Sequence, residues 1–185
     1  MSTLKTTCIT HGSNSGTANL ALASDGSITF AKTMFASYAI LADQKAAGSG
    51  GGASSGNAWT ESVLNTEIAD PDSIVSISSN QFTLGAGNYL IKWKKSFFAT
   101  QRVVTRLYDV TNSAVKQNSM TVGAFNNSGA VTFSHGIARV TPTGSTAYKF
   151  QYYADNQDGD GQGVDAPDDE CVGIYLLVEI YKEAS

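Results

Sequence analysis

Residues 70–98, DPDSIVSISSNQFTLGAGNYLIKWKKSFF, contain three short segments in which apolar and polar residues alternate. The apolar positions of these segments are Val75 and Ile77, then Phe82 and Leu84, then Tyr89, Ile91 and Trp93. A period of two with β-branched and aromatic residues is typical of strands that pack one face on a core. The GAGN cluster at 85–88 is a turn signal, because its glycines can adopt positive φ. The stretch therefore predicts three strands at the centre of an antiparallel β-sandwich.

The rest of the chain continues this pattern, and no segment has a clear helical period. Further strands are predicted at residues 35–42, 59–68, 102–110, 114–122, 130–140, 147–154 and 171–182. The segment 59–68 also fits a short helix, but no capping or stop signal frames one. Gly136, inside the segment 130–140, predicts a β-bulge or a bend. About ten short strands separated by turns favour a sandwich or a jelly roll.

Composition limits the classes of protein to which the chain can belong. Its 185 residues predict one domain and a short arm. Only 15% of the residues are charged, against roughly 25% in typical soluble domains, which favours a surface buried in an assembly. The net charge of −4 and the lack of a basic tract argue against nucleic acid as a partner. Neither a membrane span nor a signal peptide is apparent, so we expect folding in a cytosol.

The two cysteines, Cys8 and Cys171, lie far apart in the sequence and have no metal-ligand spacing. We expect two reduced thiols. The lysines at 92, 94 and 95 form the densest basic cluster, and we expect them to lie on a solvated edge.

Residues 1–33 predict an N-terminal arm built on a small β-hairpin, and residues 34–185 predict the main domain. The SDGS sequence at 24–27 is a tight turn, because Asp-Gly is a favoured hairpin centre. So small a sheet is marginal alone. We therefore expect the arm to attach to a partner surface through its apolar residues, Leu20, Leu22, Ile28 and Phe30.

The last predicted strand is apolar on both faces. Tyr175, Leu177 and Tyr181 lie on one face, and valine, leucine and isoleucine residues lie on the other. A surface strand of a monomeric sandwich would be polar on one side. If this strand and the strand at 147–154 share a sheet, its outer side is a tyrosine-rich patch of the kind found at interfaces. The predicted subunit interface is Tyr148, Tyr153, Tyr175, Leu177 and Tyr181.

Three segments resemble a known family: FASYAILADQKA at 35–46, FTLGAGNYLIKW at 82–93 and GIYLLVEIYK at 173–182. They resemble the complement C-one-q/tumour-necrosis-factor-like jelly roll, in the version found in bacteriophage structural proteins. The likeness covers residues 35–185, and the arm at 19–30 is similar to hairpins that attach modules to phage virions. The resemblance implies an all-β, ten-stranded antiparallel jelly-roll sandwich that forms a homotrimer. A collagen-like stalk is missing, and the acidic loop at 155–170 has no counterpart in the family.

That acidic loop begins like a calcium-binding loop, with Asn156-x-Asp158-x-Asp160-Gly161. The twelfth position is Pro167 instead of the expected glutamate. The candidate calcium ligands are Asn156, Asp158, Asp160 and Asp165, and a solvated loop is the favoured alternative. No other cofactor is expected.

His135 and Ser134 are adjacent, but no nucleophile motif accompanies them, so a nucleophilic enzyme is not expected. The residues and the resemblance together predict a homotrimeric structural protein of a phage virion. Its arm would bind another virion protein, such as the major capsid protein, and capsid cement or decoration is the preferred role. The alternative is a receptor- or carbohydrate-binding tip of a tail fibre that contacts a host surface glycan.

Overall fold

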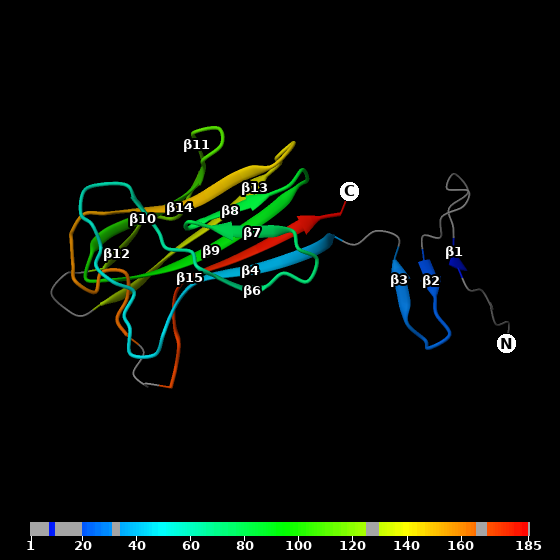
Figure 1. Cartoon of the computed structure of the whole chain (residues 1–185), viewed down its shortest axis with the longest axis horizontal. Coiled ribbons are helices and arrows are strands. Elements are labelled where there is room, and N and C mark those ends of the chain that lie inside the picture. Colours follow the sequence, from blue (N-terminus) through cyan, green and yellow to red (C-terminus); the bar gives the residue numbers. More distant parts are fainter. Residues whose placement is uncertain (1–7, 10–19, 31–33, 125–129, 166–169, 185) are drawn as a thin grey trace. The chain divides into compact units, whose positions relative to one another are not determined.

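The computed structural model describes residues 8–9, 20–30, 34–124, 130–165 and 170–184, and every regular element in these ranges is a strand (Figure 1). No helix capable of crossing a membrane occurs in them. The chain divides into two compact units. One contains the residues up to Ala36 together with Ala184 near the other end of the sequence, and the other spans Ser37–Glu183. The two units are described separately below.

The N-terminal unit contains an antiparallel sheet of three strands, β1 (Cys8–Ile9), β2 (Leu20–Leu22) and β3 (Ile28–Phe30), in that order. The β2–β3 hairpin turns at Gly26, whose φ is 85°. The Ser27 N–H donates to Oδ1 of Asp25 at 2.8 Å, and this hydrogen bond lowers the pKa of Asp25. The hairpin therefore forms where the Asp-Gly signal predicts it, and β1 adds a third strand.

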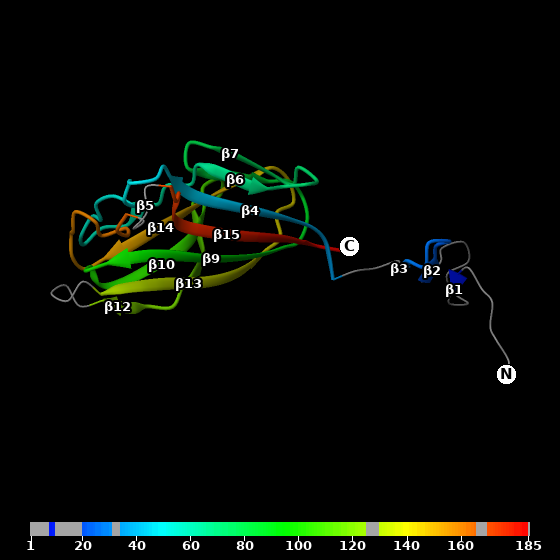
Figure 2. The ribbon, with the colours of Figure 1, turned by 90° about the horizontal axis from the view of Figure 1, so that it is seen from below.

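The second unit is a sandwich of two antiparallel sheets, as the sequence predicts. The five-stranded sheet has the order β13-β9-β15-β4-β6, and Figure 2 shows its strands side by side. Its strands are β4 (Phe35–Lys45), β6 (Thr66–Ala69), β9 (Tyr89–Phe98), β13 (Val131–Val140) and β15 (Gly173–Glu183).

The seven-stranded sheet has the order β11-β10-β14-β8-β7, with β12 paired to β10 and β5 paired to β14. Its strands are β5 (Thr60–Glu61), β7 (Val75–Ser78), β8 (Gln81–Leu84), β10 (Gln101–Asp109), β11 (Ala114–Asn118), β12 (Val122–Ala124) and β14 (Thr146–Ala154). The described part of the body thus has twelve strands instead of ten, because the predicted strands at 59–68 and 114–122 each break into two.

The break in the segment 59–68 has a clear cause. Strand β5 belongs to the seven-stranded sheet and β6 to the five-stranded sheet, so the chain crosses the sandwich between them. The Ser62 N–H donates to the Phe150 carbonyl at 2.9 Å, and the Asn65 N–H donates to the Ala42 carbonyl at 3.0 Å. Leu64 fills the core at the crossing. The prediction of one continuous strand is therefore wrong.

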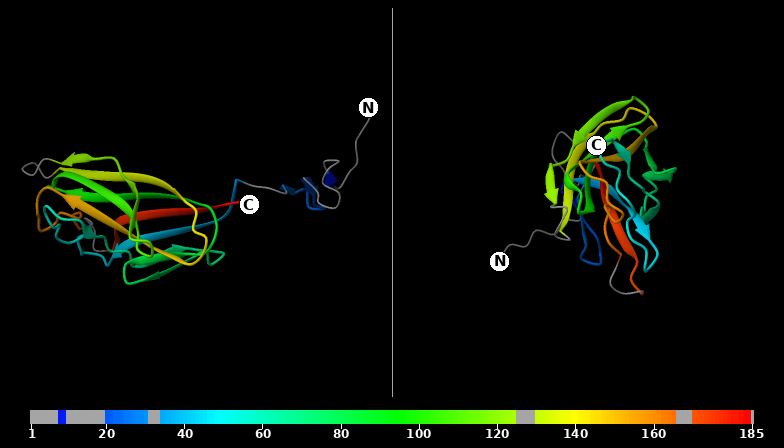
Figure 3. Two further views of the ribbon diagram at one scale, coloured as in Figure 1. Left: turned by 90° about the horizontal axis from the view of Figure 1, so that it is seen from above. Right: turned by 90° about the vertical axis from the view of Figure 1, so that its left-hand side faces the viewer.

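The two sheets lie face to face (Figure 3), and apolar side chains from both form a shared core between them. The rings of Trp93 and Phe150 lie 5.3 Å apart in the larger of two apolar clusters. The smaller cluster contains Phe97 and Tyr152. The larger cluster includes Trp93 of β9 and Leu107 of β10, the smaller includes Phe97 and Val103 of the same two strands, and the inward positions between them hold polar residues.

Lys95 occupies one of these intermediate positions, between Trp93 and Phe97 on the inward side of β9. Its side chain is fully buried, and its Nζ has no hydrogen-bond partner among the described residues. Burial lowers the pKa of Lys95 to about 8, although the buried carboxylate of Asp43 opposes this shift. The expectation that Lys95 lies on a solvated edge is wrong, because its position in the alternation places it with Trp93 and Phe97.

Gly136 also lies on the inward side of its strand. The pairing of β13 with β9 runs without a register shift, and Gly136 lies opposite Trp93. The predicted bulge or bend is therefore not needed to explain this glycine. A Cβ built on Gly136 would overlap Cζ2 and Cε2 of the Trp93 indole. Glycine is present because the indole occupies the space of a side chain, and the indole N–H in turn donates to Oγ1 of Thr105 at 2.7 Å.

We expect the substitution Gly136→Ala to lower the free energy of unfolding by roughly 1–3 kcal/mol, the usual cost of overpacking a core. The indole would have to move and weaken its hydrogen bond to Thr105. Urea denaturation followed by tryptophan fluorescence measures the change. Gly144→Ala is the matched control, because a Cβ there meets no atom within 4 Å. Equal stability of the two variants would contradict the packing role of Gly136.

Candidate subunit interface

The outer face of the five-stranded sheet is rich in apolar side chains, although the inner face of the same sheet packs on the core. On β15, Leu176, Val178 and Ile180 are fully buried on the inner side. The outer face is defined here by the outward apolar residues Tyr38, Leu90, Phe98, Val131, Phe133, Ile137, Leu177 and Tyr181. A sheet that is apolar on both sides is typical of a sheet covered on both sides.

Strand β13 contributes the most exposed part of this outer face. Phe133 is 43% exposed, Val131 49% and Ile137 54%. They alternate with the inward residues Ser134 and Ala138. Sequence reasoning missed these residues, although β13 has the same two-sided pattern that drew attention to β15.

The charged groups on the outer face are held by their neighbours. The Tyr181 hydroxyl donates to Oε2 of Glu179 at 2.8 Å, which raises the pKa of Tyr181. Nζ of Lys92 lies 3.9 Å from the same oxygen. Nζ of Lys94 lies 4.2 Å from the centroid of the Phe133 ring, within the range of a cation–π contact. Each of these charged groups therefore has a partner within the chain, which it can keep when another surface covers the face.

Arg139 and Glu183 form an ion pair at one end of this sheet. Nε and Nη2 of Arg139 each lie 2.7 Å from a different carboxylate oxygen of Glu183. This bidentate contact is the strongest geometry for such a pair, and it lowers the pKa of Glu183.

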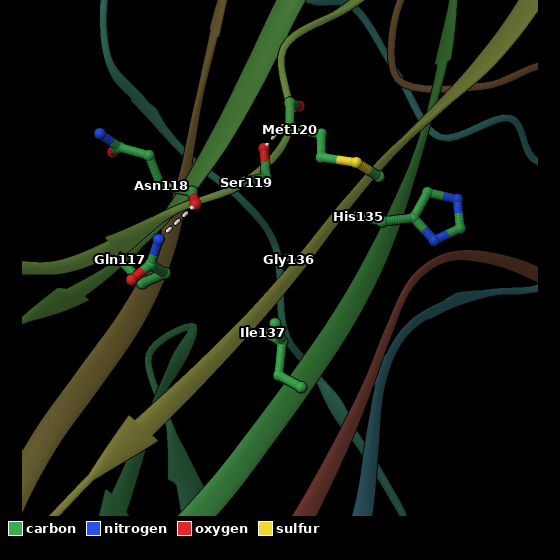
Figure 4. Close-up of a pocket in the computed structure, with 7 residues that line it drawn as sticks. All are labelled: Gln117, Asn118, Ser119, Met120, His135, Gly136 and Ile137. Atoms are coloured by element: carbon green, nitrogen blue, oxygen red, sulfur yellow. Dashed lines mark hydrogen bonds between the residues drawn. The ribbon is translucent and has the colours of Figure 1, made fainter.

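Two hollows lie beside the middle of β13. The smaller has a volume of about 200 Å³, and it opens among Lys92, Lys94, His135, Leu177 and Glu179. The larger, of about 410 Å³, is lined by Gln117, Asn118, Ser119, Met120, His135, Gly136 and Ile137 (Figure 4). The Met120 N–H donates to the His135 carbonyl at 3.1 Å, which ties the segment after β11 to this edge strand. The larger hollow therefore lies between the edge strand β13 and the segment at the end of β11.

The structure separates the five residues predicted for the interface. Leu177 and Tyr181 are half-buried on the outer face. Tyr175 is on the same side but is covered by its own chain, because its hydroxyl donates to the carbonyls of Ser49 and Val164 at 2.8 and 3.0 Å. Burial raises its pKa. The prediction of an accessible Tyr175 is therefore wrong.

Tyr148 and Tyr153 do not join this outer face. Strands β14 and β15 belong to different sheets, so the tyrosine patch that required them in one sheet does not form. Tyr148 packs inside the larger core cluster, where burial raises its pKa to about 12. Tyr153 points outward from the opposite sheet, which leaves Leu177 and Tyr181 as the predicted interface residues that still fit.

The acidic loop forms local turns. Oδ1 of Asp158 accepts the Asp160 N–H at 2.9 Å, and the Asp160 carbonyl accepts the Gly163 N–H at 2.8 Å. Within the described ranges, no group of three or more His, Cys, Asp or Glu residues could hold a metal ion. A calcium site made by Asn156, Asp158, Asp160 and Asp165 stays a prediction.

The four apolar residues proposed for the arm are described in part. Ile28 is 54% exposed, which leaves it available to a partner. The side chains of Leu20, Leu22 and Phe30 lie outside the described residues, although their backbones form the β2–β3 pair. Of the two cysteines, Cys171 is a free and exposed thiol, and the side chain of Cys8 is outside the described residues.

No family model matches the chain, and no curated protein matches its sequence. Solved structures do match its fold. Murine APRIL at pH 5.0 superposes with a TM-score of 0.53 at 7% identity, over 79% of this chain and 98% of that chain. Eiger TNF from S. frugiperda superposes with a TM-score of 0.53 at 11% identity, over 82% of this chain and 94% of that chain.

The PRD1 vertex protein P5 also matches, with a TM-score of 0.47 at 15% identity, over 81% of this chain and 99% of that chain. The likeness to APRIL and Eiger shows the fold alone, because the identities are low. The body is an all-β jelly roll, similar in fold to murine APRIL and to Eiger TNF.

Proposed function

We propose that this chain is a non-enzymatic structural protein that forms a homotrimer through the outer face of its five-stranded sheet. One observation carries the proposal: this sheet is apolar on both faces, and β13 leaves Phe133 and Ile137 exposed. Large exposed apolar surfaces mark interaction sites on soluble proteins. The low charged fraction of 15% supports the same conclusion. The family resemblance implies three copies as the stoichiometry.

The place of this trimer is a phage virion, and the preferred role is cement or decoration of the capsid. Support comes from the sequence resemblance of residues 35–185 and from the hairpin signal in the arm. The arm folds as a compact unit of its own, which suits a separate attachment element. Its exposed Ile28 offers an apolar contact to a neighbouring virion protein such as the major capsid protein.

Deletion of residues 1–33 is expected to leave the body trimeric while abolishing its incorporation into particles. The body has its own core, so it does not need the arm to fold. Light scattering measures the mass of the truncated protein, and sedimentation of phage particles with the labelled full-length and truncated chains measures incorporation. Equal incorporation of both chains would contradict the anchoring role.

Electron microscopy of particles that carry the labelled full-length chain tests the location. Label over the capsid shell is the expected result. Label confined to the tail tip would overturn the cement role in favour of the tail-fibre alternative.

A further inference from the structure

Aromatic and polar side chains also gather on the opposite side of the sandwich, on the outer side of the seven-stranded sheet. We name this group the aromatic platform, and it consists of Trp59, Arg106, Tyr108, Gln151 and Tyr153. Strand β14 lies between β10 and β5 at this point, with Arg106 opposite Gln151 and Tyr152 opposite Thr60. The platform is therefore built by two paired strands, β10 and β14, and by Trp59, the residue that precedes β5.

Arg106 is held in an unusual way for an arginine of this chain. Its guanidinium carbon lies 3.8 Å from the centroid of the Trp59 ring and 5.3 Å from that of Tyr108. Its Nε donates to Oε1 of Gln151 at 2.9 Å. The two other arginines, Arg102 and Arg139, each pair with a carboxylate. Among the described residues, no carboxylate forms an ion pair with Arg106, so its positive charge is held by neutral groups.

Trp59 is 37% exposed, although tryptophan is usually among the most buried residues. The backbone on both sides of it is fixed. The Asn57 N–H donates to the Ala154 carbonyl at 2.7 Å, and Thr60 pairs with Tyr152. The Tyr153 ring packs against Trp59 at 5.7 Å in an edge-on arrangement. The indole is thus held rigidly at the surface, as a preorganised binding site requires.

These groups define the chemistry of a matching ligand. A guanidinium supplies parallel N–H donors that fit a carboxylate, and an exposed indole packs against an apolar ring face. Lys149 and Glu61, whose charged groups lie 2.9 Å apart beside the platform, add a donor and an acceptor suited to hydroxyl groups. A sugar acid combines a ring with C–H faces, hydroxyl groups and a carboxylate.

We infer that the aromatic platform binds an acidic saccharide, whose sugar ring packs on Trp59 and whose carboxylate pairs with Arg106. The platform and the outer face of the five-stranded sheet belong to different sheets, so the site does not depend on trimer formation. A phosphate group alone would use the guanidinium but would leave the exposed part of the indole, which Arg106 and Tyr153 do not cover, in contact with water, and this favours the sugar acid.

Isothermal titration calorimetry of the full chain with trigalacturonic acid and with 3′-sialyllactose tests the inference, and neutral lactose serves as the reference ligand. We expect at least one acidic saccharide to bind about tenfold more tightly than lactose, the scale of one charge-assisted contact. Trp59→Ala and Arg106→Lys should each weaken that binding by about tenfold or more. Arg139→Lys is the matched control on the other sheet and should bind as the wild type does.

Absence of binding of both acidic saccharides to the wild type would overturn the inference, as would unchanged binding by Trp59→Ala and Arg106→Lys. Light scattering on the same samples separates this site from the subunit interface. The two platform variants should keep the mass of the wild type. A change in their mass would mean that the platform is a contact between copies of the chain, and this too would overturn the saccharide site.

Discussion

Replacing Ile137 with arginine is expected to convert the trimer into monomers. Ile137 is the most exposed apolar residue of β13, and it lines the larger of the two hollows beside this strand. A charge buried there without a partner costs roughly 3–5 kcal/mol, which weakens association by more than a hundredfold. Because Ile137 is 54% exposed within one chain, the arginine can reach water in the monomer, and the fold should survive.

Light scattering at micromolar concentration should show the variant at the chain mass of 19.4 kDa and the wild type at three times that mass. Val115→Arg is the matched control, since Val115 is a 45% exposed apolar residue on β11 of the other sheet. This control should remain trimeric. A trimeric Ile137→Arg variant would place the interface elsewhere, and a monomeric control would mean that any added arginine disrupts the protein.

Replacing the buried Lys95 with methionine is expected to stabilise the protein at neutral pH. Methionine keeps the apolar stem of lysine and removes an ammonium group that has no hydrogen-bond partner among the described residues. The lowered pKa of about 8, against an ordinary value of 10.5, corresponds to a destabilisation of about 3 kcal/mol. This pKa already includes the attraction of Asp43. Part of the gain is lost because Nζ of Lys95 lies 5.6 Å from the ring centroids of Phe97 and Tyr152, and methionine removes both cation–π contacts. A net gain of roughly 1–3 kcal/mol is expected.

The pH dependence of stability gives this prediction a distinct signature. Below pH 8 Lys95 is protonated in both states, and its burial is fully unfavourable. Between pH 8 and 10.5 the unfolded chain binds more protons at this residue than the folded chain, so stability rises with pH. Wild-type stability should rise by about 2 kcal/mol from pH 8 to about pH 9.5, below the ordinary tyrosine pKa of 10.0.

Urea denaturation at one fixed chain concentration measures both effects, because stability of an oligomer depends on concentration. Lys95→Met should lack the rise above pH 8 that the wild type has. Lys116→Met, which replaces a partly exposed lysine, should retain it. Loss of stability in Lys95→Met at neutral pH would contradict the prediction, because it would mean that the contacts of the ammonium with Asp43, Phe97 and Tyr152 outweigh the cost of its burial.

The alternation of apolar residues was sufficient to predict a sandwich or a jelly roll and most of its strands, and the family resemblance favoured the jelly roll. It worked for the stretch 70–98 because β7, β8 and β9 each place one face on the core. It failed for the segment 59–68, since a chain that crosses between sheets keeps apolar residues such as Leu64 without forming a ladder. Lys94 and Lys95 are adjacent in a strand, so one of them must point inward, but their charge led to the prediction that both are solvated.

The candidate interface could be predicted only in part. The two-sided pattern of β15 identified the sheet, but not which outward residues stay accessible. The Tyr175 hydroxyl is covered by the carbonyl of Ser49, 126 positions away in the sequence, and by the carbonyl of Val164 in the acidic loop. Tyr148 points into the core. The aromatic platform was also out of reach, because Trp59, Arg106 and Gln151 meet only through the pairing of β5, β14 and β10.

Sedimentation equilibrium of the wild-type chain across the micromolar range tests the central claim most directly. The claim is that the outer face of the five-stranded sheet is covered by other copies of the chain. The expected result is a single species at three times the chain mass of 19.4 kDa. A single species at 19.4 kDa throughout this range would contradict it.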